Sequence, residues 1–94
     1  DALTTRGETV FRASGCTACH TVRGTDAMAQ IGPDLTHVGS RSHIGAATLT
    51  NARETLMQWI AQADRVKPGV HMPAFRALAS DDLTALAAYL GSLQ

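Results

Sequence analysis

The chain has few large side chains for its size. Of its 94 residues only 4% are aromatic, and 16 of the residues counted as hydrophobic are alanines. A chain of this length buries only about 60–70% of the surface that it exposes when unfolded, so a core poor in bulky residues needs support from a cofactor, a metal or disulfides. We therefore expect one small domain, residues 1–94, that folds around something besides its own side chains.

Net charge and long apolar runs are also missing. Eight Lys and Arg residues balance eight Asp and Glu residues. A nucleic-acid-binding domain would need a basic stripe, which these scattered charges do not form. No stretch approaches the roughly 18 to 20 apolar residues of a membrane-spanning helix. These absences argue against a nucleic-acid partner and against direct insertion of these residues into a membrane.

The spacing of apolar residues predicts three helices. The first covers about residues 5–14, the second about residues 51–63, and the third begins with Ser80 as its N-cap. Asn51 is a suitable N-cap for the second helix, and Glu54 three residues later completes a pattern like a capping box.

Residues 16–50 show no sustained helical or strand period, and glycines punctuate them. Irregular loops longer than about 12–15 residues are uncommon in compact domains unless they are functional, and wrapping a large ligand is one sufficient reason. We predict an all-α fold without strands, in which three principal helices and two long loops surround a cofactor.

Both cysteines fall in one motif, Cys16-Thr17-Ala18-Cys19-His20. The CxxCH pattern is typical of covalent haem attachment: two thiols bond the vinyl groups and the adjacent imidazole reaches the iron. A disulfide would close only a short loop, a redox dithiol would need a βαβ context, and zinc would need two further ligands. The motif therefore predicts one covalent haem c with His20 as its proximal ligand.

The sixth ligand of the iron has several candidates in the sequence. They are Met28, Met57, Met72, His37, His43 and His71. Met72 lies in a loop that Pro68 and Pro73 make stiff, which suits the weak thioether ligand. His71 competes with it, but adjacent residues of an extended segment point in opposite directions. We predict that Met72 binds the iron.

Axial ligation bears directly on function. Two ligands that stay in place keep the iron saturated and exclude exogenous molecules, which favours one-electron transfer over catalysis. The alternative, a peroxidase-like protein or a ligand sensor, requires that Met72 leave the iron open. We expect an electron-transfer domain that is not by itself an enzyme.

The sequence resembles class I cytochromes c over nearly its whole length. The matching segments are Cys16-Thr17-Ala18-Cys19-His20, Gly32-Pro33-Asp34-Leu35, Trp59-Ile60, Lys67-Pro68-Gly69-Val70-His71-Met72-Pro73 and Leu86-Ala87-Ala88-Tyr89-Leu90. The resemblance implies that the Pro33 carbonyl accepts a hydrogen bond from the His20 ring. It also implies that Arg41 and Trp59 reach the haem propionates.

The family resemblance further implies a contact between the first and last helices. Gly7 and Phe11 of the first helix are expected to pack near Tyr89 of the last one, with Gly7 permitting the close approach.

A narrower resemblance concerns residues 32–41, Asn51 and residues 67–73. These segments are similar to the cytochrome c domain at the C-terminus of subunit II in caa3-type haem-copper oxidases, although Ala47 stands where a glycine is usual. The resemblance implies electron transport in a respiratory chain, with the copper centre of the oxidase as acceptor. A free soluble cytochrome or a dehydrogenase-associated periplasmic one is the alternative.

The same resemblance implies a setting for the domain. We expect it to lie outside the cytoplasm, in the periplasm or on the outer face of the cytoplasmic membrane, tethered within a larger membrane-anchored protein. As an isolated domain it is expected to be monomeric. Its neutral charge predicts that redox partners dock weakly, through a mostly apolar surface near the haem edge.

Overall fold

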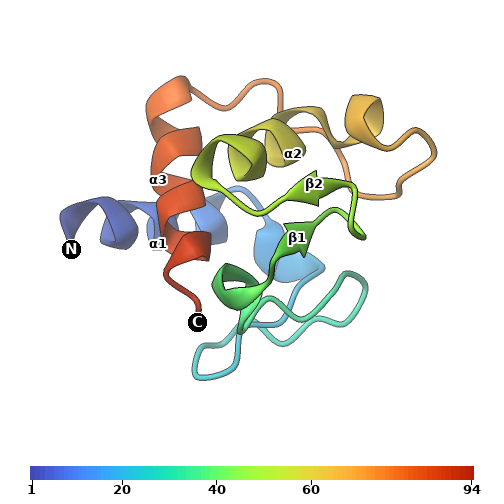
Figure 1. The fold of residues 1–94 in the computed structure, drawn as a ribbon. Coiled ribbons are helices and arrows are strands. Elements are labelled where there is room, and N and C mark those ends of the chain that lie inside the picture. Colours follow the sequence, from blue (N-terminus) through green and yellow to red (C-terminus); the bar gives the residue numbers. More distant parts are fainter.

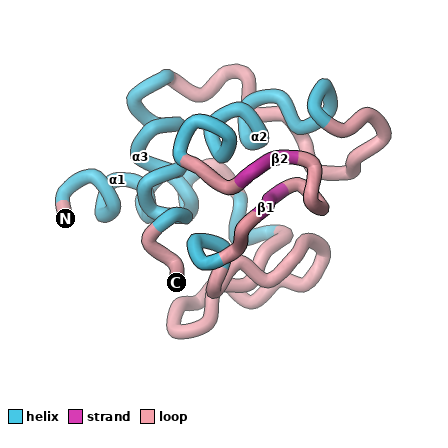
Figure 2. The backbone as a smooth tube through the Cα atoms, in the orientation of Figure 1, coloured by secondary structure: helices cyan, strands magenta, loops and turns pink.

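The computed structural model describes residues 1–94 and contains three α-helices. The elements in chain order are α1 (Ala2–Ala13), the 3-10 turns η1 (Cys16–Ala18) and η2 (Val38–Ser40), β1 (His43–Ile44), β2 (Leu49–Thr50), α2 (Arg53–Val66) and α3 (Ser80–Gly91). Helices α1 and α3 cross on one side of the molecule, and long loops make up much of the other side (Figures 1 and 2). None of these helices has the length and apolar character needed to cross a bilayer.

The crossing of α1 and α3 depends on Gly7. A Cβ atom at this position would lie 2.0 Å from the carbonyl oxygen of Ala85 and 2.6 Å from the Cβ of Tyr89. Next to this contact, the rings of Phe11 and Tyr89 lie 5.6 Å apart between centroids and are tilted by 59°. The contact that the family resemblance implies is therefore present, and only a glycine fits at its centre.

The hydrophobic core is small. Only 16 of the 94 residues are buried, so much of the interior wall is formed by half-buried side chains. The core cluster consists of Val10, Phe11, Val22, Ala27, Val38, Ile44, Leu56, Ile60, Leu86, Ala87, Tyr89 and Leu90. This agrees with the shortage of large side chains in the sequence.

Helix α1 begins three residues earlier than predicted. Asp1 is its N-cap: its carboxylate accepts a hydrogen bond from the Thr4 backbone N–H at 2.9 Å, and the Asp1 nitrogen donates to the Thr4 hydroxyl oxygen at 3.0 Å. The first of these bonds satisfies an amide group that the first turn leaves free. Helix α3 differs by a single residue, because Ser80 is its first helical residue and Ala79 is its N-cap.

The predicted capping pair of α2 is wrong. Asn51 does not cap this helix, because its side-chain amide is hydrogen-bonded to two carbonyls of an earlier loop. Ala52 is the N-cap, and its N–H donates to the hydroxyl of Thr55 at 2.9 Å. The helix then continues to Val66, with a kink at Gln62 where φ is −138°.

The prediction that the chain contains no strands is also wrong. Strands β1 and β2 form a short antiparallel hairpin that pairs His43 with Thr50 and Ile44 with Leu49. Two-residue strands are too short to show alternation in a sequence. The turn between them contains Ala46 and Ala47 at φ 55° and 70°, in the left-handed region that favours glycine.

Candidate haem site

A cavity of about 760 Å³ lies among the loops, lined mostly by hydrophobic residues. Its walls come from the segment after α1, the loop before β1, the hairpin, α2, α3 and the loop between these two helices. The predicted site residues Cys16, Cys19, His20, Pro33, Arg41, Trp59 and Met72 all line it. Segments far apart in the chain therefore meet at one cavity.

The attachment segment is shaped by the end of α1. Gly15 follows the helix at φ 84°, and the chain then turns through η1, where the N–H groups of Cys19 and His20 both donate to the Cys16 carbonyl. Both cysteines are half-buried, and neither forms a disulfide. Burial raises the pKa of the Cys16 thiol, because desolvation disfavours the thiolate.

The His20 ring is held on two sides. Its Nδ1 lies 2.8 Å from the carbonyl oxygen of Pro33, which can only accept, so Nδ1 carries the proton and Nε2 keeps its lone pair. Gly32 lies against the ring, because a Cβ there would be 2.5 Å from its Cε1 atom. Gly32 also donates its N–H to the Cys19 carbonyl at 2.6 Å. The ring thus presents Nε2 as the free ligand atom.

Met72 is half-buried, in a loop that is fastened to α2. The Phe75 N–H donates to the Ile60 carbonyl at 3.0 Å. The Arg76 guanidinium bonds both carboxylate oxygens of Asp64, at 2.5 and 2.7 Å. These contacts lie a few residues after Met72 and restrict the movement of its loop.

The other two methionines do not line the cavity. The Met28 side chain is 74% exposed to solvent. Met57 packs against the core, and its sulfur accepts a hydrogen bond from the Thr84 hydroxyl at 3.9 Å. Among the methionines, Met72 alone has its side chain at the cavity.

The histidines divide differently. His43 and His71 are exposed residues that also line the cavity. His37 does not line it: its Nδ1 lies 3.0 Å from the Gln94 carbonyl, and its Nε2 lies 3.0 Å from Nη2 of Arg23. His43 and His71 therefore stay competitors of Met72 for the sixth position.

Arg41 and Trp59 reach the cavity from different elements, Arg41 from the end of η2 and Trp59 from α2. Nη2 of Arg41 donates to the Asp34 carbonyl at 2.6 Å, while the residue itself is exposed. The half-buried Trp59 ring lies against Gly45, where a Cβ would come within 2.8 Å of it. Both side chains therefore have fixed neighbours at the cavity.

Sequence reasoning missed what two glycines do at the site. Gly32 supports the His20 ring and Gly45 supports the Trp59 ring. The interruption of hydrophobic periodicity marked both as turn residues, but the ring that each one contacts is set by tertiary folding.

The donor set fits a haem c. Two thiols and an oriented imidazole line the cavity together with a thioether from a distant loop. By contrast, no group of three or more His, Cys, Asp or Glu side chains is placed to hold a metal ion, so the zinc alternative has no ligand set.

Size leads to the same conclusion. Ligand sites are typically clefts of about 300–1,000 Å³ lined mostly by apolar side chains. The cavity of about 760 Å³ therefore has the size and the lining of a cofactor site. A small helical fold with this donor set and a cavity of this size defines a protein of the haem c class.

Comparison with known proteins identifies the family. The cytochrome c profile matches residues 4–94, so the chain belongs to the cytochrome c family and binds haem c covalently. Over its full length it is 39% identical to cytochrome c oxidase subunit 2 of Alkalihalophilus pseudofirmus and 34% identical to that of Bacillus sp. strain PS3, covering 27% of each. A gluconate 2-dehydrogenase cytochrome c subunit of Pantoea cypripedii is 29% identical over 95% of the chain, which covers 23% of that protein. The chain thus spans about a quarter of the length of these relatives.

The family and the architecture agree. The predicted class I cytochrome c fold, with three principal helices around one haem, is confirmed, and the small hairpin is the addition to it. Electron transport is the role that this family assignment supports.

Proposed function

We propose that this domain transfers single electrons through a haem c whose axial ligands are His20 and Met72. The haem supplies an iron centre that gains and loses one electron. The observation that carries the proposal is the shared cavity, which brings the two cysteines, the oriented His20 ring and Met72 together.

Other residues of the chain restrict the movement of the two proposed ligands, His20 and Met72. The Pro33 carbonyl and Gly32 fix the plane and tautomer of the His20 ring. The bonds that Phe75 and Arg76 make to α2 hold the loop of Met72. Ligands that move little when the charge on the site changes keep the reorganisation energy small, which suits electron transfer better than catalysis. Arg41 and Trp59 are proposed to contact the propionates.

For the partner, we propose the copper centre of a caa3-type haem-copper oxidase, reached outside the cytoplasm. The two relatives from Alkalihalophilus pseudofirmus and Bacillus sp. strain PS3 are named as oxidase subunit 2, and the similarity to each covers the whole of this chain. The dehydrogenase-associated alternative is supported by the relative named as a gluconate 2-dehydrogenase cytochrome c subunit.

The proposed docking surface is the segment 27–33, which carries no charged residue. Its Met28 and Ile31 are the large hydrophobic side chains most exposed in the chain, at 74% and 83%, and Ile31 also lines the cavity. The acidic residues at either end have basic neighbours: Asp26 pairs with Arg12, and Asp34 lies 4.0 Å from Arg23. A neutral apolar surface beside the haem suits a weak partner contact with little dependence on salt.

Axial ligation is tested by optical spectroscopy of the haem-loaded protein. We expect the ferric form to show the weak sulfur-to-iron charge-transfer band, and we expect that the ferrous form does not bind CO. Met72→Ala should lose the band and bind CO, whereas Met57→Leu, a methionine away from the cavity, should change neither. A Met72→Ala spectrum like that of the parent would assign the sixth position to another residue, with His71 the first to test.

Docking is tested by electron transfer to a soluble copper domain of an oxidase subunit 2. Ile31→Lys should slow the reaction and make its rate depend on salt. Gln58→Lys, which adds the same charge on an exposed part of α2, should have little effect. Faster reaction of the parent protein with a purified gluconate 2-dehydrogenase than with the copper domain would favour the alternative partner.

A further inference from the structure

Asn51 holds both ends of one turn. Its Nδ2 donates to the carbonyl of Val38, the first residue of η2, at 2.9 Å, and to the carbonyl of Arg41, which ends the turn, at 2.8 Å. Its backbone N–H adds a third contact, to the Ser42 carbonyl at 2.9 Å. One half-buried asparagine thus fixes the segment from Val38 to Ser42 next to the start of α2.

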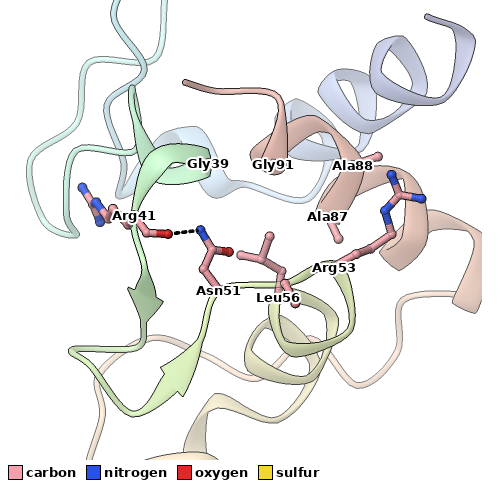
Figure 3. Close-up of a pocket in the computed structure, with 9 residues that line it drawn as sticks. Gly39, Arg41, Asn51, Arg53, Leu56, Ala87, Ala88 and Gly91 are labelled. Atoms are coloured by element: carbon pink, nitrogen blue, oxygen red, sulfur yellow. Dashed lines mark hydrogen bonds between the residues drawn. The ribbon is translucent and has the colours of Figure 1, made fainter.

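Val38 places the start of the turn in the hydrophobic core, and the rest of the turn is held differently on its two sides. Toward α3 it is held firmly, because Gly39 donates to the Leu93 carbonyl at 2.7 Å and a Cβ on Gly39 would lie 2.2 Å from the Gly91 oxygen. Toward α2 it faces a pocket of about 280 Å³ that Asn51 and Leu56 help to line. In Figure 3 the Asn51 amide points at the Arg41 carbonyl beside this pocket. The hydrogen bond from Asn51 to the Arg41 carbonyl therefore restrains the end of the turn, where residues 40–42 are exposed.

Arg41 connects the turn to the large cavity. Figure 3 shows its guanidinium pointing away from Asn51 while its carbonyl points toward it. The guanidinium is held by one bond, to the Asp34 carbonyl at 2.6 Å, and the residue lines the large cavity as well as the small pocket. Since the side chain is exposed, its place at the cavity depends on where the backbone of residue 41 is fixed.

We propose that Asn51 is a positioning residue that sets the reduction potential by fixing Arg41 at the edge of the haem cavity. This inference rests on the proposed function, in which Arg41 faces the propionates. A positive charge near the haem disfavours the more positive oxidised state and raises the potential, and its influence falls with distance. Freeing the turn lets the guanidinium move away, so the potential falls.

The test is a double-mutant cycle on the midpoint potential of the haem-loaded protein. Asn51→Ala should lower the potential, by less than Arg41→Gln does, and should add no further shift when combined with Arg41→Gln. Thr55→Val is the matched control: it removes side-chain bonds to the Thr50 and Ala52 backbone at the start of α2 and touches no part of the turn. It should lower thermal stability without shifting the potential through Arg41.

Three results would overturn the inference. An Asn51→Ala shift of equal size in both Arg41 backgrounds, or no shift at all, would mean that Asn51 does not act through Arg41, while leaving electron transfer and axial ligation intact. An unchanged potential in Arg41→Gln alone would instead refute the propionate role of Arg41, and the inference with it. If Asn51→Ala does not take up haem, Asn51→Ser, which keeps one donor, enters the same cycle with the same outcomes.

Discussion

The α1–α3 crossing and the loops around the cavity are stabilised in different ways. At the crossing, backbone meets backbone so closely at Gly7 that a methyl group has no room. Around the cavity, the loops place only scattered residues such as Val22 and Val38 in the core. They are otherwise held by polar contacts, such as the bond from the Thr21 hydroxyl to the Ala29 carbonyl at 2.7 Å and the ion pair of Arg12 with Asp26. The first region is held by its own packing. The second has a large space at its centre and depends on what fills it.

The largest effect should come from preventing covalent attachment. We expect Cys16→Ser combined with Cys19→Ser to abolish the cooperative thermal transition, because only 16 residues are buried and the apolar walls of the cavity would lose their contacts with the haem. In amide hydrogen exchange, protection in residues 19–50 should disappear before protection in α1 and α3. A double variant that melts as cooperatively as the haem-loaded parent would show that the loops do not need the cofactor.

Gly7→Ala tests the close packing at the crossing of α1 and α3. Its new Cβ would meet the Ala85 backbone oxygen, which cannot rotate away, so the helices must separate. We expect a loss of about 3 kcal/mol in the free energy of unfolding, measured in urea. Gly91→Ala is the matched control, since a Cβ there meets nothing within 4 Å, and we expect it to be neutral or to stabilise by up to about 1 kcal/mol. Equal effects at the two glycines would contradict the close-contact argument.

Replacing alanine by glycine should change the stability of the protein in opposite directions in the two regions. Ala47 lies in the hairpin turn at φ 70°, where an L-residue is strained, so Ala47→Gly should stabilise the protein by about 1 kcal/mol. Ala13→Gly, at the exposed end of α1, should destabilise it by up to about 1 kcal/mol. Thermal denaturation of both variants tests the contrast. Loss of stability in Ala47→Gly would mean that the turn gains more from the methyl group than it loses in strain.

The features that could be predicted from sequence are local or chemically distinctive. The apolar stripe of α2 shows in the spacing of Leu56, Ile60 and Ala63, which are all buried. The CxxCH motif needs no tertiary information, because its donor atoms are adjacent in the chain. Ala47 stands where a glycine is usual in the family, and this too has a local explanation, since the backbone at Ala47 is left-handed.

The features that could not be predicted depend on distant partners. Asn51 has the side chain of a good N-cap, and only the folded chain brings the carbonyls of Val38 and Arg41 within its reach. The hairpin has strands too short to produce a period. Which ring rests on Gly32 or Gly45 is likewise decided by contacts between segments far apart in the sequence.

The smallest effect should come from the ion pair that fastens the Met72 loop to α2. The Arg76 guanidinium lowers the pKa of Asp64 below its usual value of 3.8 by hydrogen bonding to the carboxylate. A group whose pKa is lower in the folded state stabilises that state at higher pH, and this contribution is lost as the pH falls through the folded value. Asp64→Asn should therefore lower the urea midpoint slightly at about pH 7 and match the parent at about pH 2. In an Arg76→Gln background the same substitution should have no effect at either pH. A residual effect there would mean that Asp64 contributes to stability in another way than through its ion pair with Arg76.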